Sequence, residues 1–218
     1  MITLYHCDGA RSFRPLWMLE ELGADYELKM LPFPPRVLAK EYLAINPLGT
    51  IPFLIDGETK MTESSGICHY LGVKHGPTPL MVGPEEADYG AFLNWMYFSD
   101  ATLTFPQTLV LRYTQLEPEE RRSAQVATDY AKWFLGRLRA VEAATANAEF
   151  LCAGRFTAAD IVIGYALRLA DTLGLAKDFG PNVAAYWARL QQREGYSRAR
   201  AAEQRAGEEQ GIKPRVRP

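Results

Sequence analysis

The residues with the clearest chemical potential form a loop, a strand and a helix start in the first third of the chain. The segment NPLGTIPFL at Asn46–Leu54 joins a loop to a short apolar strand, and Glu63–Ser65 opens a helix soon afterwards. Proline at the mouth of an apolar strand occupies an edge or first position, unless the Ile51–Pro52 bond is cis. A cis bond would turn the N–H and C=O of Ile51 outward, where they can pair with an extended peptide.

The helix start offers a second binding feature. A helix that opens with Ser64 and Ser65 presents free N–H groups to a carboxylate. Together, the two features could hold the backbone and one acid end of a small peptide. The alternative is a strand–turn–strand–helix unit in which Ser64 only caps its helix.

The composition restricts the class of protein. The chain has 218 residues, of which 48% are hydrophobic and 23% charged, and this favours one or two globular domains with a sizeable core. A net charge of -2 provides no basic field for nucleic acid or a membrane surface. Scattered cysteines at Cys7, Cys68 and Cys152 disfavour a disulfide or zinc fold and favour a reducing cytosol. We therefore expect a cytoplasmic protein with no metal, and no membrane span because no apolar run approaches about 18 residues.

The first 75 or so residues alternate between strand and helix patterns. The expected elements are strands at Ile2–Tyr5, Tyr26–Leu31, Pro52–Ile55 and Thr59–Thr62, a helix from Ser12 to Leu22, a short helix at Val37–Ile45, and a helix from Ser64 to Val73. A βαβ unit followed by a hairpin and a covering helix predicts an α/β sandwich.

The rest of the chain is predicted to be helical. Lys74–Pro84 is rich in proline and glycine and is typical of a linker. Expected helices cover Glu85–Asp100 and Pro118–Thr145, and others begin at Thr157 and Pro181. The helix after Thr157 is nearly apolar all round, which predicts the buried centre of a bundle. The polar segment Glu203–Pro218 is expected to be mobile.

Three motifs occur in a recognisable order. NPLGTIPFL is followed by Glu63-Ser64, a linker, and GRFTAADI at Gly154–Ile161, which has the form of a capping box. On these motifs the chain resembles the cytosolic glutathione transferases over nearly its whole length. The resemblance implies a thioredoxin-like glutathione-binding domain at 1–76, a linker at 77–84, an all-helical domain at 85–202 that contributes the electrophile pocket, and a flexible tail at 203–218.

The resemblance also implies glutathione as co-substrate. It places Pro52 at the family's cis-proline, so that the Ile51 backbone pairs with the cysteinyl residue, while Glu63 and Ser64 hold the γ-glutamyl head. Arg36 or Lys40 would meet the glycine carboxylate, although either could be a solvated charge. Asp100 would reach the amino group, in the same or the partner subunit; a plain surface aspartate is the alternative.

Activation of the thiol is expected near the start of the first helix. Ser12 stands where a hydroxyl donor at a helix N-terminus would lower the thiol pKa. Arg11 is the alternative, as partner or main activator, followed by Tyr5 or Cys7; Ser12 could also be a plain N-cap. Cysteine-type classes want a cysteine about where Arg11 stands, so we expect a serine-type or atypical member. The local sequence looks closer to bacterial members acting on lignin-derived ethers, which carry Asn-Ser in place of Arg11-Ser12.

The electrophile would be held by the helical domain. In the family this region walls the pocket, and the matching residues here are Tyr97, Phe105, Arg112 and Tyr113, with ordinary core packing as the alternative. The implied protein is a homodimeric detoxification enzyme that attacks a small hydrophobic electrophile with glutathione. A non-catalytic binding or regulatory module of the same fold is the competing hypothesis, but a pure scaffold need not keep the ligand groups.

Overall fold

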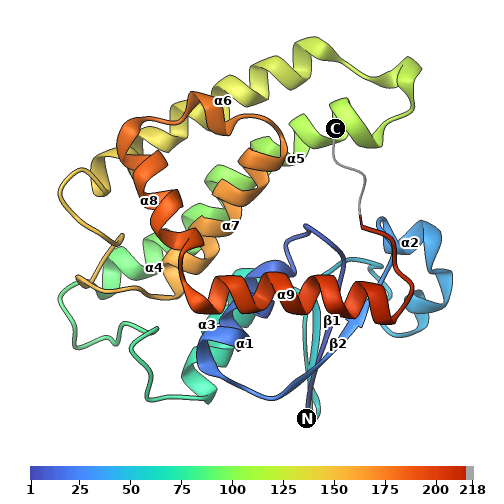
Figure 1. Ribbon diagram of the computed structural model, residues 1–218, viewed down its shortest axis with the longest axis horizontal. Coiled ribbons are helices and arrows are strands. Elements are labelled where there is room, and N and C mark those ends of the chain that lie inside the picture. Colours follow the sequence, from blue (N-terminus) through green and yellow to red (C-terminus); the bar gives the residue numbers. More distant parts are fainter. Residues whose placement is uncertain (215–218) are drawn as a thin grey trace. The chain divides into compact units, whose positions relative to one another are not determined.

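The computed structural model describes residues 1–214 and divides into two compact units (Figure 1). Among the described residues, the first unit joins 1–81 with 191–214, and the second spans Val82–Leu190. Within residues 1–214, no helix is long and apolar enough to cross a membrane.

The first unit is built on a four-stranded mixed sheet. Its strands are β1 (Ile2–His6), β2 (Tyr26–Met30), β3 (Phe53–Asp56) and β4 (Thr59–Met61), in the order β2-β1-β3-β4. β1 pairs parallel to β2 and antiparallel to β3, and β3 pairs antiparallel to β4. The βαβ unit, hairpin and following helix confirm the predicted thioredoxin-like fold.

Helices α1 (Phe13–Leu22) and α3 (Ser64–Lys74) pack together in this unit. α1 connects the two parallel strands, and its residues from Phe13 to Leu19 are all buried because neighbouring elements cover more than one of its faces. Gly23 ends it in the left-handed conformation at φ 61°, as its sequence position predicted. The predicted helix at Val37–Ile45 is instead α2 (Pro35–Leu38) and a 3₁₀ turn at Lys40–Ala44.

The C-terminal helix α9 (Glu194–Glu209) also belongs to the first unit, where it packs on α1 and β2 (Figure 1). Its Gln210 side chain accepts a hydrogen bond from the Met30 N–H and donates one to the Leu28 carbonyl, each at 2.8 Å. Since β2 is an edge strand, this amide occupies backbone groups that would otherwise lack a partner strand.

These contacts correct two predictions about the end of the chain. The predicted helical domain at 85–202 extended too far, because α9 packs within the first unit. The predicted mobile tail from Glu203 is wrong as far as Glu209, because this stretch is helical and buries Glu203 and Ala206. The part of that tail at 215–218 lies outside the described residues.

The second unit is helical, as predicted. Its main elements are α4 (Tyr89–Phe98), a π-helical stretch at Ser99–Thr104, α5 (Phe105–Leu111), a second π-helical stretch at Arg112–Leu116, α6 (Ala124–Ala144), α7 (Ala158–Thr172) and α8 (Pro181–Gln191), with short 3₁₀ turns at Glu119–Arg121 and Ala176–Asp178. The long helix predicted from Pro118 begins later, because Ser123 caps α6 by accepting the Val126 N–H.

Helix α7 is the buried centre of this unit, as its apolar sequence predicted. The capping box at its start is present: the Asp160 carboxylate accepts the Thr157 N–H at 2.8 Å. The same carboxylate accepts the Leu151 N–H at 3.1 Å and the Tyr186 hydroxyl at 2.8 Å. Asp160 therefore holds together the start of α7, the preceding loop and α8.

Candidate functional site

The start of α3 combines an exposed acid with a buried cation. Glu63 occupies the N-cap position with extended backbone, and its exposed side chain makes no capping bond. Ser64, the first helical residue, is buried, and its hydroxyl oxygen accepts a 2.8 Å hydrogen bond from Nη1 of Arg14. The Arg14 side chain comes from α1 and is fully buried. A helix N-terminus and a guanidinium are thus brought together.

This arrangement favours a carboxylate ligand. The first-turn N–H groups and the helix dipole attract negative charge, and the buried arginine adds a full positive charge beside them. Because the Ser64 oxygen already accepts from Arg14, its hydroxyl hydrogen is left to donate. Sequence reasoning missed Arg14; the available signal was a charged residue inside the apolar run between Phe13 and Leu19.

The Ile51–Pro52 peptide bond is cis, as one of the two sequence alternatives required. The β1–β3 register ends at the Tyr5–Phe53 pair, so Ile51 lies beyond the ladder. The loop before it is fixed through the Thr50 carbonyl, which accepts from the Asn46 amide at 2.9 Å and the Tyr42 hydroxyl at 2.8 Å. The Ile51 backbone is therefore carried on a braced loop.

The two basic candidates for the glycine carboxylate differ in how they are placed. Arg36 and Lys40 are both exposed. The loop glycine Gly49 has φ 59° and lies so close to Arg36 that an added Cβ would be 2.6 Å from the Arg36 Cβ. Tight packing therefore ties Arg36 to the loop that leads to Ile51, and this favours Arg36 over Lys40.

The candidates for thiol activation differ in burial. Ser12 is at the N-cap of α1 but fully buried, and its side chain makes no capping bond; its hydroxyl oxygen accepts a long 3.4 Å bond from the Cys7 N–H. Cys7 is also fully buried, whereas Arg11 and Tyr5 are half-buried. A ligand cannot touch Ser12 in this conformation, so burial weighs against Ser12 and favours Arg11.

The predicted electrophile residues are mostly at the surface of the second unit. The Tyr97 side chain is 68% exposed, and Asp100 is half-buried in the π-helical stretch. Arg112 pairs with Glu117 at 2.7 Å and lies 5.8 Å from the centre of the Tyr113 ring. This exposure argues against the alternative prediction that Tyr97 packs in the core.

Phe105 alone among these predicted residues lines a pocket of ≈ 330 Å³ in the second unit. The other lining residues are Phe98, Ala101, Thr102, Pro106, Trp133 and Arg137. Its walls are aromatic, with the Phe105 and Trp133 rings 6.5 Å apart between their centres. Sequence reasoning missed Trp133, which lies on α6, far along the chain from Phe105.

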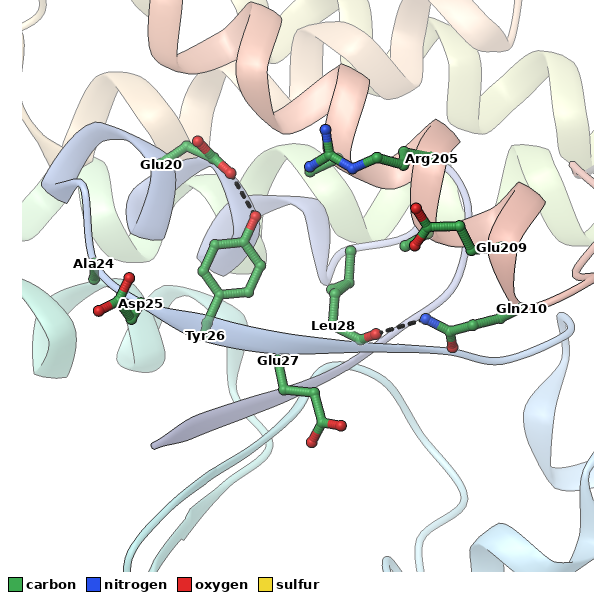
Figure 2. A pocket seen from close by; sticks show the side chains of 11 residues that line it. Glu20, Ala24, Asp25, Tyr26, Glu27, Leu28, Arg205, Glu209 and Gln210 are labelled. Carbon is green, nitrogen blue, oxygen red and sulfur yellow. Dashed lines mark hydrogen bonds between the residues drawn. The ribbon is translucent and has the colours of Figure 1, made fainter.

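A larger pocket of ≈ 450 Å³ lies in the first unit, between β2, the end of α1 and α9 (Figure 2). The Tyr26 hydroxyl donates a 2.5 Å hydrogen bond to Glu20, drawn as a dashed line in Figure 2. Burial is the largest cause that raises the pKa of Tyr26 well above its usual value, and the bond to Glu20 raises it further. None of the predicted site residues lines this pocket. In the described part of the chain no cluster of three or more His, Cys, Asp or Glu side chains is arranged to hold a metal ion.

The fold and this site define a class: a thioredoxin-like unit that carries a cis-proline and an anion-attracting helix start, on one chain with a helical unit. A family model described as "Glutathione S-transferase, N-terminal domain" matches residues 4–79. Glutathione S-transferase hmp2 of Hypomyces subiculosus is 30% identical over 175 residues, which cover 74% of this chain and 80% of that protein. The chain therefore belongs to the glutathione S-transferase family of enzymes.

Two further relatives carry the same family name. Glutathione S-transferase GstA of Escherichia coli O157:H7 is 27% identical over 205 residues, covering 93% of this chain and 98% of the relative. Glutathione S-transferase 3 of Schizosaccharomyces pombe is 35% identical over 103 residues, covering 47% of this chain and 43% of that protein.

Solved structures show the same fold. A glutathione transferase from Methylococcus capsulatus has a TM-score of 0.83 at 24% identity, covering 94% of this chain and 99% of that one. The glutathione transferase URE2P6 from Phanerochaete chrysosporium, in complex with oxidized glutathione, has a TM-score of 0.81 at 26% identity, covering 94% and 97%.

Proposed function

We propose that this protein binds glutathione and activates its thiol for attack on a small hydrophobic electrophile. The observation that carries the proposal is the Arg14–Ser64 contact at the start of α3, next to the exposed Glu63. The γ-glutamyl head of glutathione carries a carboxylate and an ammonium group. Ser64 and the first-turn N–H groups fit the carboxylate, and Glu63 fits the ammonium group.

The rest of the tripeptide fits the braced loop. The N–H and C=O of Ile51, next to Pro52, would pair with the cysteinyl backbone of glutathione, as an added strand pairs with a sheet edge. Arg36, held against this loop by Gly49, would meet the glycine carboxylate, with Lys40 as the alternative. Asp100 is proposed as a further partner of the amino group.

The chemical step needs a thiolate. The glutathione thiol loses its proton to solvent, the thiolate sulfur forms a bond to an electrophilic carbon, and the displaced group leaves that carbon with the electron pair of the broken bond. We assign thiolate stabilisation to Arg11, because a cation close to a thiol lowers its pKa and because Arg11 is less buried than Ser12. Ser12, the N-cap residue of α1, would then contribute through the helix start and not through direct contact with the thiol.

The second unit is proposed to supply the electrophile contacts, through Tyr97, Phe105, Arg112 and Tyr113. The aromatic walls beside Phe105 support a preference for flat, apolar electrophiles. In keeping with the family, we propose a cytoplasmic homodimer that acts in detoxification, as a serine-type or atypical bacterial member.

Retention on immobilised glutathione tests this proposal. The wild type should be retained and eluted by free glutathione, and Glu63→Ala should lose retention because the ammonium group loses its counter-charge. Glu58→Ala is a matched control, since Glu58 is an equally exposed carboxylate in the β3–β4 turn of the same unit. Undiminished retention of Glu63→Ala would refute the site. Retention without turnover on an aryl halide, an epoxide, a peroxide and a β-aryl ether would instead support the non-catalytic alternative.

A further inference from the structure

A carboxylate on the C-terminal helix reaches the loop that leads into α1. The Glu203 side chain is only 4% exposed, and its Oε1 lies 2.9 Å from Nε2 of His6, the last residue of β1. The same oxygen accepts a 2.9 Å hydrogen bond from the N–H of Gly9. One oxygen atom thus holds both the end of a central strand and the loop that follows it.

His6 and Gly9, the two partners of the Glu203 oxygen, both suit this contact. His6 is fully buried and meets Glu203 through Nε2, while its Nδ1 has no hydrogen-bond partner among residues 1–214. Gly9 has φ 66°, in the left-handed region that glycine adopts at low cost. The contact therefore fixes one backbone conformation of the loop.

The stability of the fold does not by itself explain why a glutamate occupies position 203. The residues around it on the buried face of α9 are small and apolar: Ala199, Ala202 and Ala206. Burying a charge is costly, and replacing a buried ionic contact by apolar side chains is often neutral or stabilising. An apolar residue at position 203 would let α9 pack, but it could not hold the Gly9 N–H.

We propose that Glu203 is a positioning residue for the thiol site. By fixing Gly9, it sets the conformation of the loop Cys7–Arg11 and so the place of Arg11, two residues further on. The inference rests on the proposed role of Arg11.

Three variants of the full chain test the proposal. Glu203→Ala removes both contacts of the oxygen, while Glu203→Gln keeps an oxygen that can accept from Gly9. Arg193→Ala is the control, because Arg193 also fastens α9 to α1, through a two-bond ion pair with Glu21 at 2.8 Å. All three are compared after thermal melting confirms that they are folded.

The first measurement is hydrogen exchange of a peptide covering Cys7–Arg11, in the free protein. Glu203→Ala should speed exchange of the Gly9 amide about 10-fold or more, because a hydrogen bond to a charged group is lost. Glu203→Gln should show a smaller change, and Arg193→Ala none. The second measurement is the thiolate absorbance band of bound glutathione against pH. Glu203→Ala should raise the pKa of the bound thiol by about one unit and lower kcat/KM about 10-fold.

The outcomes separate this inference from the proposed function. Unchanged exchange and an unchanged thiol titration in a folded Glu203→Ala would overturn the inference, as would an equal change in Arg193→Ala. A wild type that fails to bind glutathione would refute the proposed function, while the exchange measurement would still decide whether Glu203 holds the loop. If Glu203→Ala does not fold, Glu203→Leu takes its place, because an apolar side chain fills the position but cannot accept the Gly9 N–H; wild-type behaviour of that variant in both measurements would overturn the positioning role.

Discussion

Removal of the Ser64 hydroxyl is the most direct perturbation of the proposed glutathione head site. Ser64→Ala deletes one oxygen that, in the structure, accepts from the buried Arg14 at 2.8 Å and is left to donate to the ligand. The first-turn N–H groups and Glu63 remain in place. We therefore expect weaker glutathione binding in a protein that still folds.

The magnitude follows from the charges involved. A hydrogen bond to a charged group contributes about 1.5–3 kcal/mol, and the Ser64 hydroxyl would donate to a carboxylate. Loss of that bond should raise the Kd for glutathione about 10- to 150-fold, at about 1.4 kcal/mol for each factor of ten. The free protein should also lose some stability, because Arg14 gives up one acceptor.

Titration calorimetry with glutathione measures the Kd, and urea denaturation measures stability. The control is Ser123→Ala, which removes the cap of α6 in the second unit: it should cost about 1 kcal/mol of stability and leave the Kd unchanged. A Kd for Ser64→Ala within twofold of the wild type would show that the start of α3 does not read the ligand carboxylate through Ser64.

Three further predictions concern the capping box, the thiol and the assembly. Burial, the largest cause, raises the pKa of Asp160 from 3.8 to about 6. An acid that holds its proton more tightly in the folded state contributes most to stability below pH 3.8. The free energy of unfolding, relative to Asp160→Asn, should therefore fall by about 3 kcal/mol as pH rises from about 4 to 6. Denaturant titrations across that range check this, and a constant difference would contradict it. Arg11→Ala should raise the pKa of bound glutathione by about one unit or more and Ser12→Ala by less, read from the thiolate band; the reverse order would return the activating role to Ser12. Light scattering should give twice the chain mass of 24.5 kDa, and a value near 24.5 kDa would exclude the homodimer.

Burial was the property that the sequence predicted least well. The buried face of α9 is made mainly of alanines and one glutamate, which gave no apolar periodicity and led to the prediction of a mobile tail. The burial of Ser12 was equally hidden, because the residue type that caps a helix also packs inside it. Composition says how polar a segment is, but not which surface will cover it.

The sequence by itself determined the local features of this protein. These features are the cis-proline at Pro52, the start of α3 at Ser64 and the capping box at Asp160. Each depends on residues only a few positions apart, so the local sequence is enough to bring the groups together. Only the tertiary structure brought Arg14 to Ser64, fifty positions away, and Glu203 to Gly9, across nearly the whole chain. Such contacts depend on which helix faces turn toward the sheet, and packing of the whole unit decides that. The groups proposed to hold the ligand were therefore readable in the sequence, while Arg14 and Glu203, proposed to add charge to the site and to position it, were not.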